Sequence, residues 1–199
     1  MQSQDDIIVF DIETSNFFTS PEVGWGNFDA IDISVVGVYS YNRDEYACFE
    51  SSDKEQLQEW FTNAKTIVGF ASNRYDTPIL NLYFKKLGAE AGGPLDLWRK
   101  DRVDLLEEIE LGTGRRIGLS RLAEANLGEG KSGHGSEAIT LFEQGRIEEL
   151  KAYCLKDVEL TKKLYDQFTE KRFFYIPDRD TNEMKLVKFN APSLQLPLF

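Results

Sequence analysis

Residues 7–14, Ile-Ile-Val-Phe-Asp-Ile-Glu-Thr, combine an unbroken apolar run with two acidic side chains. The apolar run over residues 7–10, which includes three β-branched residues, predicts a strand that is covered on both faces. Side chains alternate across a strand, so Asp11 and Glu13 are expected to project from the same face. Neighbouring carboxylates repel each other unless they share a cation, and hard divalent cations prefer oxygen ligands. The stretch therefore indicates a metal site, and the alternative is a strand end whose acids face water.

The patterns that follow this strand predict an α/β fold with a mixed sheet. Residues 31–41 and 46–49 are expected to continue it as an antiparallel meander, and residues 66–70 form a short apolar run typical of a parallel core strand. A further short strand is expected at residues 95–98. Apolar residues at helical spacing predict helices over residues 53–64, 76–87, 103–109, 120–127, 138–142 and 147–168. This succession of strands and helices favours one mixed sheet, an antiparallel meander plus parallel strands, flanked by helices.

The charge of the chain bears on its partners. The sequence has 199 residues, is 41% hydrophobic and carries a formal net charge of −11, which fits a globular protein with a full core. Such a charge argues against broad attraction to nucleic acid, because that attraction comes from Lys and Arg neutralising phosphates. Arg115, Arg116, Arg121 and Lys131 nevertheless form a basic interval within this acidic chain, although solvated helix and loop charges would give the same pattern.

Two further features bear on location and redox state. No apolar run approaches the about 20 residues needed to cross a bilayer, and the polar first residues do not resemble a signal peptide. We therefore expect no membrane association and a cytoplasmic protein. Cys48 and Cys154 lack the spacing of metal ligands, so they are expected to be reduced thiols without a chemical role.

Two more acids lie where an element end or a helix face could present them to the same region. Asp76 follows the strand at residues 66–70 and begins a helix, and its alternative role is an N-cap. Asp157 lies in the helix at residues 147–168, with Tyr153 four residues earlier on the same face. That face is otherwise apolar, so an inward-facing charge would be costly without a partner. The alternative is an exposed aspartate beside a core tyrosine.

In order along the chain, residues 11–14 (DIET), Tyr75-Asp76 and residues 153–157 (YCLKD) resemble the three motifs of the DEDDy class of 3′-to-5′ exonucleases, in the ribonuclease H-like superfamily. The flanking residues 68–70 and 157–161 resemble the proofreading domains of family B DNA polymerases and their stand-alone bacterial relatives. The resemblance implies a ribonuclease H-like fold and two divalent metal ions, Mg²⁺ or Mn²⁺. It also implies that Tyr153 holds the attacking water. The implied metal ligands are Asp11, Glu13, Asp76 and Asp157.

The expected substrate contacts follow from the same resemblance. Thr14, Phe17 and Phe18 come after the first motif, where the family contacts the terminal nucleotide by backbone and stacking; the alternative is that they pack on the core. One departure lies before the second motif, because Ala71 stands where an asparagine is usual. Asn73 is a candidate substitute, at a shorter spacing from Asp76.

The resemblance implies stepwise hydrolysis of nucleic-acid 3′ ends to nucleoside 5′-monophosphates in DNA replication or repair, with single-stranded DNA favoured. The related DEDDh class would require a histidine at Ala152, so His134 is expected to be a loop residue. An RNA-trimming exoribonuclease is one alternative. Another is a nuclease-like module that binds partners without catalysis.

The final residues, Gln195-Leu196-Pro197-Leu198-Phe199, resemble the pentapeptide by which bacterial proteins bind the sliding clamp. Leu196, Leu198 and Phe199 would enter a hydrophobic pocket, while Gln195 would fix the register by hydrogen bonds. The alternative is a tail folded against its own domain. We therefore expect an exonuclease domain over residues 1–170, a C-terminal hairpin extension over 171–190 and a clamp-binding tail over 191–199.

Overall fold

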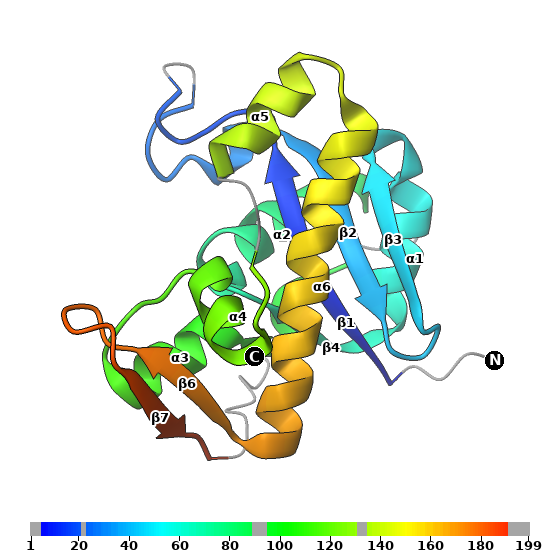
Figure 1. Ribbon diagram of the computed structural model, residues 1–199. Helices are drawn as coiled ribbons and strands as arrows, with labels where there is room; N and C mark the ends of the chain where they lie inside the picture. Colours follow the sequence, from blue (N-terminus) through cyan, green and yellow to red (C-terminus); the bar gives the residue numbers. More distant parts are fainter. Residues whose placement is uncertain (1–4, 21–22, 89–94, 131–134, 191–199) are drawn as a thin grey trace.

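The central sheet of the computed structural model is mixed, as the sequence predicts. The structure describes residues 5–20, 23–88, 95–130 and 135–190. The sheet has the strand order β3-β2-β1-β4-β5 (Figure 1). The strands are β1 Asp6–Thr14, β2 Ile33–Ser40, β3 Glu45–Glu50, β4 Ala64–Gly69 and β5 Asp101–Asp104. Because β1 pairs antiparallel with β2 and parallel with β4, the predicted meander and parallel strands are confirmed.

Helices cover both faces of this sheet (Figure 1). They are α1 Lys54–Asn63, α2 Asp76–Leu87, α3 Leu105–Thr113, α4 Leu119–Leu127, α5 Gly135–Glu143 and α6 Ile147–Lys171. Ile8, Phe10 and Ile12 of β1 pack with residues of α1 and α2 in one apolar cluster. Val9 packs with residues of α4 and α6 in a second cluster on the other face. The alternation along β1 therefore places its odd-numbered residues on the side of α6.

The chain between α2 and α3 differs from the prediction. The strand expected at residues 95–98 is wrong, since a 3₁₀ turn spans Leu97–Arg99, and the helix expected from residue 103 begins only at Leu105. Between them lies β5, parallel to β4. Its buried Arg102 donates hydrogen bonds to the carbonyls of Trp98 and Lys100, at 2.7 and 3.2 Å. A polar sequence can thus form a strand at the edge of the sheet when its side chains hydrogen-bond to the backbone, and hydrophobic periodicity does not detect such a strand.

After α6 the chain forms a hairpin of β6 Phe173–Pro177 and β7 Met184–Lys188, which pair antiparallel. Phe174 is buried and its ring stacks on Phe168 of α6 at 5.9 Å between centroids, which fixes the hairpin to the helix. Lys131, His134 and the tail at 191–199 lie outside the described residues. In the part of the chain that the structure describes, no helix combines the length and the apolar character that a membrane span requires.

Candidate active site

Strand β1 presents Asp11 and Glu13 to helix α6. Cys154 of α6 places its Sγ 3.6 Å from the carbonyl oxygen of Asp11 and 3.7 Å from its Oδ2. A carboxylate oxygen of Asp11, one of Glu13 and this sulfur all lie within 4.8 Å of one another. The two acids therefore occupy the same face of β1, at a distance from which both could bind one cation.

The close approach of α6 to the sheet depends on Gly37, which lies opposite Asp11 in the β1–β2 register. A Cβ atom at this position would lie 2.8 Å from the Sγ of Cys154 and 3.0 Å from Cγ2 of Val158. A glycine is thus required where the helix packs directly on the strand. Asp157 precedes Val158 on α6 and is only 5% exposed, so the alternative of a solvent-facing aspartate does not hold.

The turn after β4 carries Asp76 to the same region. Ala71 adopts a left-handed conformation with φ 62°, and the backbone N–H groups of Ala71 and Asn73 each donate to the carboxylate of Asp104 at 2.9 Å. This anchored turn leads into α2, whose N-cap is Tyr75 and not Asp76. Asp76 is the first residue of the helix and is 7% exposed, so the N-cap role weighed for it is not what the structure shows.

The electrostatics of Asp76 show that the acids lie close together. Burial raises the pKa of Asp76 well above its ordinary value, and the nearby carboxylates of Asp11, Asp104 and Asp157 raise it further. Acids from β1, α2, β5 and α6 therefore act on one another across the carboxyl end of the parallel strands, where α/β sheets build sites. A divalent cation would relieve this repulsion, and an oxygen donor set suits Mg²⁺ or Mn²⁺. The residues present thus fit a metal site.

The sulfur in this cluster is not expected to act as a metal ligand. A hydrogen bond with Cys48 raises the pKa of Cys154, and burial and the neighbouring Asp11 raise it further. A thiol that stays protonated is a poor ligand, and a hard cation prefers carboxylate oxygen. Tyr153, the preceding residue, is half-buried and packs against a cluster that includes Val35 and Leu141. It lies one helical turn before Asp157, as its spacing requires.

An aromatic cavity of about 310 Å³ opens beside Glu13. The predicted substrate residues Thr14, Phe17 and Phe18 line it, together with residues that the sequence did not single out, among them Trp25 and Ile139 of α5. Trp25 is 83% exposed, although its ring stacks against that of Phe18 at 6.3 Å between centroids. An exposed tryptophan cannot be recognised from sequence, because burial of a loop residue is set by distant contacts.

Two other side chains near the site are Tyr75 and Asn73. Tyr75 also lines the cavity, and its hydroxyl lies 3.2 Å from Oγ1 of Thr14. Asn73, the proposed substitute for the family asparagine, donates from its side-chain nitrogen to Oε2 of Glu107 at 2.6 Å. The amide of Asn73 is therefore already engaged with α3, and it is not among the residues found to line the cavity.

Comparisons with known proteins agree with this architecture. A search of curated proteins gives no significant match. Among solved structures, the chain is similar to the family B DNA polymerase from the hyperthermophilic archaeon Pyrobaculum calidifontis, with 21% sequence identity and a TM-score of 0.60. The alignment covers 82% of this chain but 24% of the polymerase chain, and it shows a shared fold. The model of the RNase_H superfamily matches residues 8–169, and the chain therefore belongs to the RNase_H superfamily.

Proposed function

We propose that this protein is a metal-dependent 3′-to-5′ exonuclease of the DEDDy class, acting on single-stranded DNA by preference. The observation that carries the proposal is the convergence of acids from three separate elements: Asp76 and Asp157 are both buried, and Asp11 and Asp157 lie near enough to Asp76 to raise its pKa. Buried like charges destabilise a fold unless a counter-charge is present. A binding module without catalysis would have no physical need for this arrangement.

In the proposed mechanism, two divalent metal ions, Mg²⁺ or Mn²⁺, would be held by Asp11, Glu13, Asp76 and Asp157. When bound, such ions activate water and stabilise the leaving 3′ oxygen of an in-line displacement. The residues of the chain bind the metal ions and the nucleic acid and orient the attacking water. Neutral phenols hydrogen-bond to water but are poor general bases at neutral pH, so we assign to Tyr153 the orientation of the attacking water.

The aromatic cavity beside Glu13 is the proposed site of the terminal nucleotide. Stacking on aromatic rings tolerates any base, which suits an enzyme that trims 3′ ends regardless of sequence. Phe17 and Phe18 are the proposed stacking residues, and Thr14 is proposed to contact the nucleotide through its backbone. Asn73 is retained as a weaker candidate, because its amide must leave Glu107 to reach substrate.

Release of nucleoside 5′-monophosphates from 3′-labelled DNA and RNA, with Mg²⁺ or Mn²⁺, tests the proposal. We expect Asp11→Asn and Asp157→Asn to lower the rate about a hundredfold or more, since each removes a charge that acts in the transition state. Glu170→Gln is the matched control, because this acid is exposed on the same helix as Asp157. Wild-type release by either aspartate variant would refute the site. Hydrolysis of RNA alone would reassign the enzyme as an exoribonuclease.

The proposed recruitment by a sliding clamp rests on the sequence of residues 195–199. Deleting this segment should abolish binding to a purified bacterial clamp and leave hydrolysis of short oligonucleotides unchanged, because the tail lies outside the matched superfamily region. Tethering would raise the local concentration of an acidic enzyme at its substrate. Unchanged clamp affinity after the deletion would refute this part of the proposal. We also propose a domain at 1–170 and a hairpin extension at 171–190, since the superfamily match ends at residue 169.

A further inference from the structure

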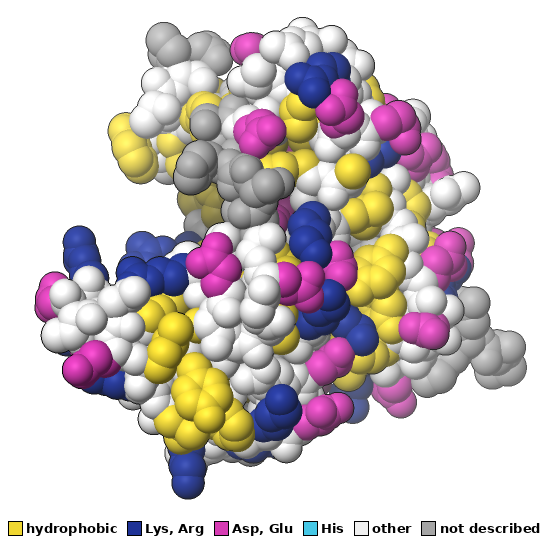
Figure 2. All heavy atoms as spheres, in the orientation of Figure 1, with side chains coloured by type: hydrophobic (Ala, Val, Ile, Leu, Met, Phe, Trp, Pro, Cys, Tyr) yellow, Lys and Arg dark blue, Asp and Glu magenta, His cyan; other side chains and the backbone are white. Residues whose placement is uncertain are grey.

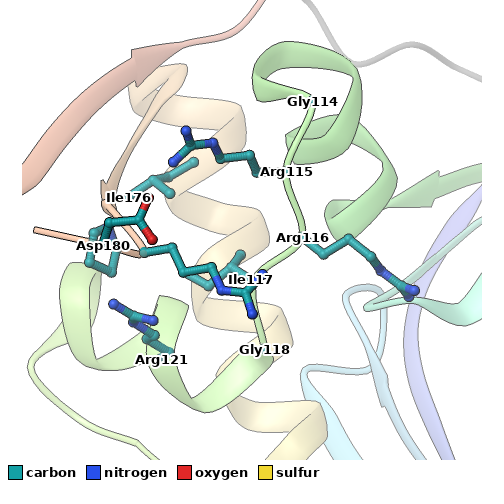
Figure 3. A pocket seen from close by; sticks show the side chains of 10 residues that line it. Gly114, Arg115, Arg116, Ile117, Gly118, Arg121, Ile176 and Asp180 are labelled. Carbon is teal, nitrogen blue, oxygen red and sulfur yellow. The ribbon is translucent and has the colours of Figure 1, made fainter. Parts of the chain in front are cut away.

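A second cavity, of about 760 Å³, lies between the α3–α4 connection and the C-terminal hairpin (Figure 3). In Figure 3, Arg115 and Arg121 lie around Ile176 and Asp180, and Arg116 extends from the same connection. The cavity has an apolar floor that includes Ile117, Ile176 and Pro177. The basic residues that line it are Arg115, Arg116, Arg121 and Arg179.

The carboxylates near this cavity do not neutralise it. Asp178 accepts ion pairs from both Arg115, at 3.1 Å, and Lys185, at 2.6 Å. Glu110 is shared in the same way between Arg116, at 2.9 Å, and Arg74. Each of these two acids therefore faces two cations. A third acid, Asp180, also lines the cavity. These three acids face six cations, Arg74, Arg115, Arg116, Arg121, Arg179 and Lys185, so the local charge is positive in a chain whose net charge is −11.

Of the remaining two arginines, Arg121 is hydrogen-bonded to neutral groups and Arg179 is exposed to solvent. Arg121 donates to Oδ1 of Asn182 at 2.8 Å and to the carbonyl of Asp178 at 3.3 Å, and neither acceptor carries a charge. Arg179 is exposed at the tip of the hairpin. The carboxylate of Asp178 holds this tip in place by accepting the backbone N–H groups of Asp180 and Thr181, at 3.0 and 3.2 Å. Arg179 is thus presented by a fixed turn, and Arg121 by helix α4.

We propose that this arginine cavity binds the phosphodiester backbone of the strand whose 3′ end occupies the acidic site; the inference rests on the proposed function. Guanidinium groups match phosphate oxygens with paired hydrogen bonds, and several of them along a groove recognise a chain of phosphates. Figure 2 shows Lys and Arg side chains gathered at the left edge of the molecule, below a hollow whose upper side is the loop after β1. A strand crossing this hollow would pass from the aromatic cavity to the arginines.

The arrangement also answers the electrostatic problem posed by an acidic nuclease. Long-range attraction of nucleic acid needs a positive surface, and a net charge of −11 opposes it. A local positive cavity supplies the attraction at the place where the strand must lie. Substrates too short to reach the cavity are therefore expected to be hydrolysed without its help.

The test compares the double variant Arg121→Gln/Arg179→Gln with Arg99→Gln/Lys65→Gln, which removes the same charge at exposed sites on other elements. Binding of a dye-labelled 15-nucleotide DNA strand is measured without divalent metal, across a salt series. The arginine variant should lose about tenfold in affinity at low salt. Its slope of log affinity against log salt should be smaller by about 1.4, since each phosphate contact on a single strand contributes about 0.7. Hydrolysis of a dinucleotide should stay within about twofold of wild type.

Other results would refute either the arginine cavity or the exonuclease proposal. A salt slope equal to that of the control, in an enzyme that hydrolyses DNA, would refute the arginine cavity alone. Equally tight, arginine-dependent binding of a poly-glutamate peptide would also refute it, because the cavity would then be a general anion surface. Loss of dinucleotide hydrolysis in the variant would show that the arginines act on the fold or the acidic site. Absence of hydrolysis by the wild-type protein would instead refute the exonuclease proposal.

Discussion

Replacement of Gly37 by alanine should move the helix that carries Asp157. The added Cβ would lie 2.8 Å from the Sγ of Cys154 and 3.0 Å from Cγ2 of Val158, whereas ordinary van der Waals contacts begin at 3.4 Å, so these side chains must shift by about 0.6 Å at most. Because the χ1 angle of a β-branched valine in a helix is restricted, we expect the helix to move with them. Overpacking of this kind costs about 1–3 kcal/mol of unfolding free energy. Because a misplacement of about 1 Å at reacting groups can cost about a hundredfold in rate, we expect kcat to fall about tenfold.

The assay combines urea unfolding without metal and single-turnover hydrolysis of a labelled oligonucleotide with Mg²⁺. Cys154→Ala removes the atom that clashes most, so a double-mutant cycle should show that it restores part of the stability lost in Gly37→Ala. Gly118→Ala is the control for the unfolding measurement alone, because a Cβ there has no atom within 4 Å but Gly118 lines the arginine cavity. Wild-type stability and kcat in Gly37→Ala would show that the close approach of α6 does not position the acid.

Three further changes test the electrostatics, the cavity and the turn. Asp76→Asn should raise the thermal unfolding midpoint of the metal-free protein at pH 7 and abolish its thermal shift with Mg²⁺. The contribution of Asp76 to wild-type stability should be greatest below pH 3.8 and be lost as pH rises through its raised pKa, so the difference in unfolding midpoint between variant and wild type, measured by differential scanning calorimetry, should grow with pH. Trp25→Ala should leave the unfolding free energy within about 0.5 kcal/mol, since the ring is 83% exposed, and should raise KM about fivefold or more through lost stacking. Asp104→Ala leaves the N–H groups of the turn before Asp76 unsatisfied and should cost about 2–4 kcal/mol in urea unfolding.

The sequence predicts the sheet best where apolar and acidic residues alternate without interruption. In β1, the two-residue period alone places Asp11 and Glu13 on one face, because successive side chains of a strand point to opposite faces. The prediction is wrong at β5, where buried Arg102 donates to a backbone carbonyl and buried Asp104 accepts a backbone N–H. Burial of this kind depends on contacts with distant segments, so it leaves no periodic signal in the sequence.

In the candidate site, too, some residues can be predicted from the sequence and others cannot. Asp76 and Asp157 are predicted from their spacing within the resemblance, but Gly37, Trp25 and Asp104 are not. Gly37 matters only because α6 crosses β2 at that point, and Asp104 matters because its carboxylate accepts N–H groups of a turn more than 30 residues earlier in the chain. Such roles follow from the packing of separate elements. They become visible once the strands and helices are assembled.

Because the acids are buried, metal binding should raise the stability of the folded protein. Apolar clusters on both faces of β1 hold Asp76 near other carboxylates against their mutual repulsion, and burial strengthens that repulsion. A cation that binds the folded site and not the unfolded chain adds stability of about 2.7 kcal/mol at a hundred times its Kd. The metal-free protein should therefore be the less stable form at neutral pH. Acids that merely faced water would bind the cation more weakly, because solvent already screens exposed charges, so the difference at the same metal concentration would be smaller.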